Sequence, residues 1–78
     1  MELKIYRKQL DKIDSQVIKL LEKREKISKK IGQYKKKNKI KVQNKSREKQ
    51  ILKKLNKNYL KHIFKIIMRN SREIQRKS

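Results

Sequence analysis

Apolar side chains recur at helical spacing through the first half of the chain. One series of positions, separated by alternating steps of four and three residues, runs from Leu3 to Asn38 and includes polar residues among the apolar ones, and a second, at steps of seven, runs from Tyr6 to Tyr34. Because an α-helix completes a turn in about 3.6 residues, both series fall on one face of a single helix. The pattern predicts one helix over residues 3–38. Gly32 lies within it, and its cost of about 1 kcal/mol is too small to break so long a repeat.

The helical period is lost after this segment and resumes later. Residues 39–46, KIKVQNKS, predict a loop, with Asn44 or Ser46 as the N-cap of the next helix. Apolar residues at helical spacing then predict a helix over about residues 45–56, a short turn, and a third helix over about residues 59–76. The sequence has no proline, no alternation typical of strands and no internal repeat. We expect an all-α fold of three helices, one long and two short.

The length of the first helix bears on the state of assembly. A helix of 36 residues is about 54 Å long, whereas a compact chain of 78 residues is only about 30 Å across. Hydrophobic residues make up 33% of the chain and charged residues 44%, which leaves little material for a monomeric core. We therefore expect an intertwined homodimeric helical bundle, in which a second copy covers the overhanging apolar stripe.

The charge is strongly unbalanced. The 27 basic residues stand against 7 acidic ones, a net charge of +20. Such a chain attracts polyanions non-specifically and favours anionic ligands. However, lysine greatly outnumbers arginine, and Lys, Ile and Asn dominate, as in A/T-biased genes, so lysines on solvated faces are the simpler explanation of the charge excess as a whole. The chain has only three Tyr and one Phe to stack on the bases of a single strand, which argues against single-strand recognition. We expect nucleic-acid binding to be non-specific at most.

Several other kinds of site and location are disfavoured. The absence of cysteine excludes disulfides and thiolate metal sites, and the single histidine, His62, lies off the main stripe with nothing to complete a metal site. Apolar runs of three or four residues neither span a membrane nor resemble a signal peptide. We expect a cytoplasmic protein with no membrane association.

Polar and charged residues interrupt the faces that the helices should bury. Burial of such groups costs several kcal/mol unless they are paired or meet a ligand. They comprise Arg7, Asp14, Arg24 and Lys35 on the long helix, Arg47 and Glu48 at the start of the second, and Ser71 and Gln75 on the third. Each has an ordinary explanation, because the cations could extend to solvent, Asp14 could set register in a helix pair, and the last two could be edge residues. Together they indicate a pocket rich in cations, with one carboxylate and neutral donors.

Arginine usage indicates what such a pocket would bind. Only six of the 27 basic residues are arginines, yet three of them (residues 7, 24 and 47) occupy these positions. The planar guanidinium matches a carboxylate in a way that lysine cannot. The pattern therefore favours a small dicarboxylate over a nucleic-acid surface.

These residues also form a recognisable series. It comprises Arg7, LDKID, IKLLEKR ending at Arg24, IGQYK ending at Lys35, NKSRE, and Ser71 and Gln75 four residues apart. With this series the chain resembles the all-helical chorismate mutases over nearly its whole length. The resemblance implies a single domain over residues 1–78 that converts chorismate to prephenate in phenylalanine and tyrosine biosynthesis. This is an intramolecular Claisen rearrangement that needs no cofactor.

The resemblance also implies catalytic roles for four residues. Lys35 and Gln75 would bond the ether oxygen of the breaking bond. Arg24 would hold a carboxylate, and Glu48 would accept the hydroxyl on the ring.

Four further residues would bind the substrate. Arg47 and, from the partner subunit, Arg7 would hold carboxylates. The backbone near Asn44 would assist at the ring hydroxyl, and Ser71 would assist at a carboxylate.

The sequence departs from the family pattern in two places. Asn44 and Lys45 stand where the family usually has Asp and Pro, which should affect the hydroxyl contact only modestly because Asn still caps a helix. The region joining the second and third helices is also about nine residues shorter than usual, which bears on the placing of Ser71 and Gln75. Two alternatives to a homodimeric mutase therefore stay open: a basic helical dimer that binds nucleic acid, and a folded but inactive relative.

Overall fold

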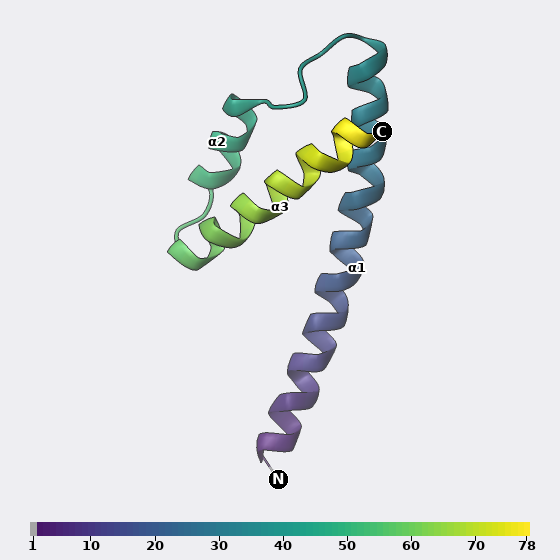
Figure 1. Cartoon of the computed structure of the whole chain (residues 1–78). Helices are drawn as coiled ribbons and strands as arrows, with labels where there is room; N and C mark the ends of the chain where they lie inside the picture. Colours follow the sequence, from purple (N-terminus) through teal and green to yellow (C-terminus); the bar gives the residue numbers. More distant parts are fainter. Residues whose placement is uncertain (1) are drawn as a thin grey trace.

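Three helices account for most of the chain. The computed structural model describes residues 2–78, with α1 at Glu2–Lys37, α2 at Lys45–Lys53 and α3 at Asn58–Lys77, and no strand in that range. Helix α3 packs against both α1 and α2 (Figure 1). The expected all-α fold of one long and two shorter helices is confirmed. None of these helices is long and apolar enough to cross a lipid bilayer.

Helix α2 ends three residues earlier than the apolar pattern predicts. The amides of Lys54 and Leu55 donate to the carbonyls of Ile51 and Leu52, three residues back, at 3.2 and 3.1 Å. Such bonds tighten and end a helix. Beyond Leu55 no apolar side chain faces inward until α3 begins, so nothing holds a further turn. The second helix is therefore only about two and a half turns long.

The end of α1 is a Schellman motif built without glycine. Lys39 adopts a left-handed conformation with φ of 56°. The amide of Ile40 donates to the Lys35 carbonyl at 2.8 Å, and that of Lys39 donates to the Lys36 carbonyl at 3.4 Å. This pair of bonds turns the chain back at Lys39, one helical turn after Lys35. The loop therefore returns past the Lys35 side chain.

Small residues allow α1 and α3 to cross closely. Ser28 and Gly32, one turn apart, are the buried residues of α1, and Met68 is the buried residue of α3. A Cβ atom on Gly32 would lie 2.6 Å from the carbonyl oxygen of Gln75 and 2.7 Å from its Cα. No side chain fits between the two backbones there. Gly32 is therefore required for this crossing and sets the position of the last turn of α3.

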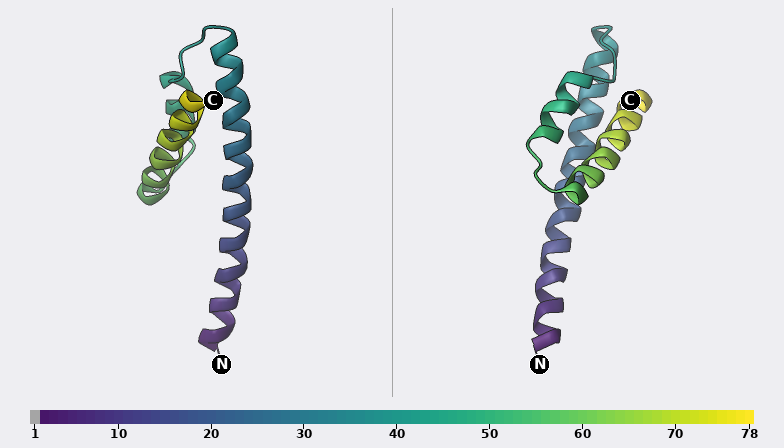
Figure 2. Two further views of the ribbon diagram at one scale, coloured as in Figure 1. Left: turned by 45° about the vertical axis from the view of Figure 1, so that its right-hand side comes forward. Right: turned by 90° about the vertical axis from the view of Figure 1, so that its left-hand side faces the viewer.

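The N-terminal half of α1 extends beyond the rest of the chain. The protomer measures 56 × 25 × 14 Å, and its radius of gyration is 15.9 Å, against about 12 Å for a compact chain of this length. Both views in Figure 2 show this half of α1 standing clear of α2 and α3. The expected overhang is therefore present in the protomer.

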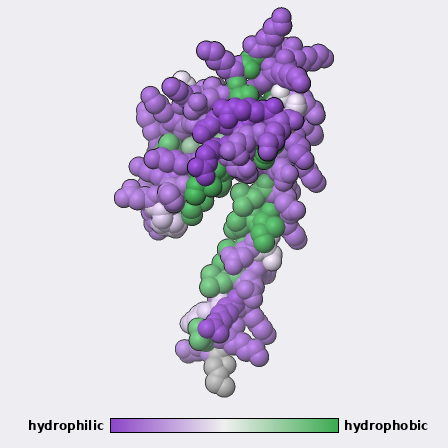
Figure 3. Space-filling view, viewed as in Figure 1, coloured by the Kyte–Doolittle hydropathy of each residue, from purple (hydrophilic) through white to green (hydrophobic). Residues whose placement is uncertain are grey.

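The overhanging segment carries apolar side chains that the protomer leaves exposed. In Figure 3 apolar surface follows this half of α1 and continues beneath α3. Its members include Leu10, Ile13, Val17 and Leu20 of α1 and Ile66 of α3, each 46–59% exposed. Surface of this extent is typical of an interaction face rather than of a solvated helix.

The left-handed residue at the end of α1 yields a stability prediction. Lys39→Gly should raise the free energy of unfolding by about 1 kcal/mol, because glycine adopts positive φ without steric strain. Lys37→Gly, two residues earlier in the helix, should lower it by up to about 1 kcal/mol. Urea unfolding at one fixed protein concentration measures both changes. Equal effects of the two substitutions would contradict the Schellman assignment.

Candidate active site

A cavity of about 360 Å³ lies between the C-terminal half of α1, the loop after it, α2 and the C-terminal half of α3. Its floor is apolar, formed mainly by isoleucines and Met68. Its polar lining is Arg24, Ser28, Lys35, Asn44, Arg47, Glu48, Ser71, Arg72 and Gln75. Of the eight residues to which the family resemblance assigns catalytic or substrate-binding roles, all but Arg7 therefore line one cavity.

The lining of this cavity is strongly cationic. The charged lining consists of four cations, Arg24, Lys35, Arg47 and Arg72, and one carboxylate, that of Glu48. Its net charge is therefore +3. Like charges around an apolar floor repel one another and attract a small anion. The cavity is therefore suited to a ligand with two negative charges.

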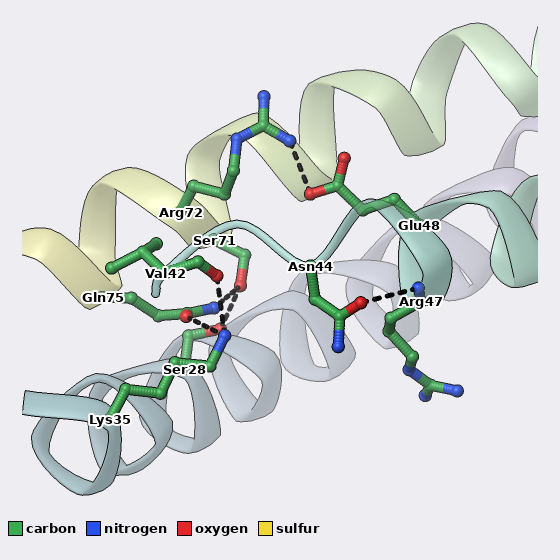
Figure 4. A network of polar contacts seen from close by, with 9 residues as sticks. All are labelled: Ser28, Lys35, Val42, Asn44, Arg47, Glu48, Ser71, Arg72 and Gln75. Carbon is green, nitrogen blue, oxygen red and sulfur yellow. Dashed lines mark hydrogen bonds and ion pairs between the residues drawn. The ribbon is translucent and has the colours of Figure 1, made fainter. Parts of the chain in front are cut away.

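Lys35 lies at the centre of a polar network. Its ammonium donates to the Val42 carbonyl at 2.6 Å and to the Gln75 Oε1 atom at 3.1 Å (Figure 4). An ammonium has three donors, so one stays available. The Schellman turn after α1 brings the loop carbonyl to this position. The side chain is thus held at two points, in a half-buried setting, with one N–H free for a ligand.

Gln75 is oriented by both ends of its amide. Its Oε1 atom accepts from Lys35, and its Nε2 atom donates to the Ser71 Oγ atom at 3.2 Å. Ser71 in turn shares a hydrogen bond of 2.7 Å with Ser28. The Lys35 contact fixes which end of the amide is the oxygen. The second N–H of Gln75 therefore remains available to donate to a ligand.

Arg24 carries an unsatisfied donor. Its Nε atom is buried and has no hydrogen-bond partner within residues 2–78. A buried donor without a partner costs about 1–3 kcal/mol. Arg24 also lies at the boundary between this cavity and a second one. Arg24 therefore contributes its positive charge at the point where the two cavities meet.

The start of α2 is capped as the sequence predicts. The Asn44 Oδ1 atom accepts from the Arg47 amide at 3.0 Å, and the Asn44 carbonyl accepts from the Glu48 amide at 3.1 Å. Asn44 therefore serves as the N-cap of α2. The cap directs the first turn of α2, with Arg47 and Glu48, toward the cavity.

Glu48 has a partner that the sequence reading missed. The Arg72 Nη1 atom donates to its Oε2 atom at 2.7 Å (Figure 4). Arg72 stands three residues before Gln75, a spacing that places both on neighbouring parts of one helix face. That spacing, and the scarcity of arginine in the chain, could have marked it as a site residue.

Arg7 lies outside this cavity. It is exposed on the overhanging half of α1, about 25 Å along the helix from Arg24 by the helical rise. One chain therefore does not bring Arg7 to the other predicted residues. Its predicted role depends on a second chain.

The second cavity, of about 640 Å³, lies between α1 and α3. Its apolar lining includes Ile18, Leu21, Ile66, Ile67 and Ile74, and it shares Ser28 and Ser71 with the first. It is continuous with the exposed apolar surface of α1. It has the character of a packing surface rather than of a binding site for a small polar molecule.

The fold and this cavity define an all-α protein with a cation-lined cavity between its helices. A family model described as chorismate mutase type II matches residues 6–76, which is nearly the whole chain, and the chain therefore belongs to that family. Among solved structures, one described as a conserved hypothetical protein from Pyrococcus furiosus has a TM-score of 0.90 and 37% sequence identity, covering 97% of each chain. Comparison with curated proteins finds no match. The family resemblance inferred from the motifs is confirmed.

The close crossing of α1 and α3 predicts how the site responds to a single added carbon. Gly32→Ala should lower the free energy of unfolding by about 1–2 kcal/mol, because overpacking against the Gln75 backbone outweighs the better helix propensity of alanine. The side-chain amide signals of Gln75 should shift in NMR spectra as its contact with Lys35 is lost. Gln33→Ala, on an exposed position of the same helix, is the matched control and should change stability by less than about 0.5 kcal/mol. A Gly32→Ala protein as stable as this control would show that the crossing is not tight.

Proposed function

We propose that this protein is an active chorismate mutase, which rearranges chorismate to prephenate in the biosynthesis of phenylalanine and tyrosine. The observation that carries the proposal is the hydrogen bond between Lys35 and Gln75 in the lining of a cavity whose charged residues have a net positive charge. Membership of the family agrees with it. The reaction is intramolecular, so the protein's task is to select a conformer and to stabilise charge, and no cofactor takes part.

Conformer selection falls to the guanidinium groups. Chorismate is a flexible dianion whose reacting carbons must be brought together before a bond can form. Arg24 and Arg47 line the cavity from two different helices and would each hold a carboxylate. Fixing both ends of the substrate shortens the search for the reactive geometry.

Charge stabilisation falls to Lys35 and Gln75. As the ether bond breaks, negative charge develops on its oxygen, and donors already directed at that point lower the barrier. Each side chain keeps one N–H free after its contacts within the protein. The network that orients them is complete without ligand, so little reorganisation is needed during the reaction.

The remaining polar residues would complete the site. The free oxygen of Glu48 would accept a hydrogen bond from the ring hydroxyl, and the backbone at Asn44 would assist there. Ser71, held by Ser28 at 2.7 Å, would assist at a carboxylate. These roles are consistent with their places around the cavity.

The working form that we propose is an intertwined homodimer. The apolar face of α1 and the second cavity offer a continuous surface that a second copy of α1 could cover. Antiparallel packing of the two long helices would carry Arg7 of each chain toward the cavity of the other. Each site would then contain one arginine from its partner.

The activity of the purified protein tests the first proposal. Addition of protein to chorismate should give a loss of chorismate absorbance above the uncatalysed rate. Lys35→Ala should lower kcat by at least about 10²-fold, the effect of removing one preorganised donor to a developing oxyanion. Lys36→Ala, at the adjacent exposed position, should leave kcat within about twofold.

Circular dichroism would show that both variants keep their helical content. A folded wild-type protein with no activity at high concentration would identify it as an inactive relative and would defeat the proposal.

Mixed dimers test the contribution of Arg7. Arg7→Ala and Arg24→Ala should each be strongly impaired alone. After unfolding and refolding together, hybrid dimers contain one site with both arginines, so an equal mixture should regain about a quarter of wild-type activity. Absence of recovery would place Arg7 in the site of its own chain or outside any site. Sedimentation of the wild type as a single chain would overturn the dimer itself.

A further inference from the structure

Arg72 makes a contact that the proposed mechanism does not yet use. Its Nη1 atom lies 2.7 Å from Glu48 Oε2, and each side chain is 21% exposed. The other ion pair within residues 2–78, Lys29 with Glu25, lies along α1 with both side chains more than half exposed. The Arg72–Glu48 pair is therefore the one within those residues that joins two helices, and it does so at the cavity.

Glu48 needs external support to hold a fixed position. It lies in the first turn of α2, which has nine residues and no fully buried residue. Helix α2 packs against α3, the helix that carries Arg72. A charged hydrogen bond at this distance is among the stronger contacts available between two short elements. Arg72 therefore fixes both the carboxylate and the end of the helix that carries it.

The pair also decides what Glu48 can do inside the cavity. Three other cations, Arg24, Lys35 and Arg47, line the same space, and an unrestrained carboxylate would be drawn to them. Such a contact would occupy donors that a dianionic ligand needs. With Arg72 holding Oε2, the Oε1 atom has no donor within residues 2–78 and is free to accept one.

We propose that Arg72 is a positioning residue. It holds the Glu48 carboxylate away from the three ligand-binding cations and presents its free oxygen to the hydroxyl of the substrate. The inference rests on the proposed mutase function, and it assigns Arg72 no contact with the substrate itself.

A double-mutant cycle on chorismate turnover tests the assignment. Arg72→Gln should lower kcat/KM by about tenfold or more, which corresponds to the loss of one charged hydrogen bond. In a Glu48→Gln background the same change should cost less than about twofold, because there is no carboxylate left to hold. Arg76→Gln, an exposed arginine on the same helix, is the matched control and should have little effect in either background.

Arg72→Lys separates positioning from folding. It retains a cation of similar length, so it should recover more than half of the kcat/KM lost in Arg72→Gln, and it keeps the test valid if Arg72→Gln does not fold. Equal losses in the two Glu48 backgrounds, or no loss at all with an active wild type, would overturn the role of Arg72 alone. An inactive wild type would instead defeat the proposed function, and the role of Arg72 would fall with it.

Discussion

The crossing of α1 and α3 is the constraint on which the candidate site depends. Two small residues one helical turn apart, Ser28 and Gly32, let the helix backbones approach until a Cβ atom on Gly32 would lie 2.6 Å from the Gln75 carbonyl oxygen. This contact sets the height of the last turn of α3 against α1. Gln75 thereby comes within 3.1 Å of Lys35. The placing of Gln75 beside Lys35 thus depends on the absence of a Cβ atom at position 32.

The cationic lining of the cavity and the exposed apolar stripe of α1 both destabilise the isolated chain. A single chain places four cations and one carboxylate around the cavity and leaves the apolar side chains of α1 in water. Both features raise the free energy of the isolated chain. A bound anion would relieve the first, and in the proposed dimer a second copy of the chain would relieve the other. Binding of either to the folded state should therefore stabilise the fold as well as complete the site.

The sequence predicted the parts of this structure that depend on side-chain periodicity. The long helix, the Asn44 cap and the shared face of Ser71 and Gln75 follow from spacing and capping along the chain, whereas the meeting of these two residues with Lys35 was implied by the family resemblance. The early end of α2 and the left-handed Lys39 did not, since neither has the glycine or proline that usually marks a helix end.

Contacts through the backbone and between distant helices were beyond the sequence reading for a different reason. The Val42 carbonyl that holds Lys35 has no side-chain signature, because every residue has such a carbonyl. Arg72 meets Glu48 only because α2 and α3 pack side by side, and that packing depends on the turn between them. Arg7 lies on the overhanging half of α1, outside the cavity of its own chain, so its proposed role depends on a second chain.

The short α2 divides the site into two parts with different support. Lys35, Ser71 and Gln75 are placed by the α1–α3 crossing and by the loop after α1, so the length of α2 does not affect them. Arg47 and Glu48 are placed by α2, which has only its cap and its packing on α3. The proposed donors to the ether oxygen therefore have a rigid base, whereas the proposed hydroxyl acceptor depends on one ion pair. Under the proposed mechanism, a short α2 leaves the support of the bond-breaking step intact and weakens that of substrate recognition, where Arg72 supplies support that further helical turns would give.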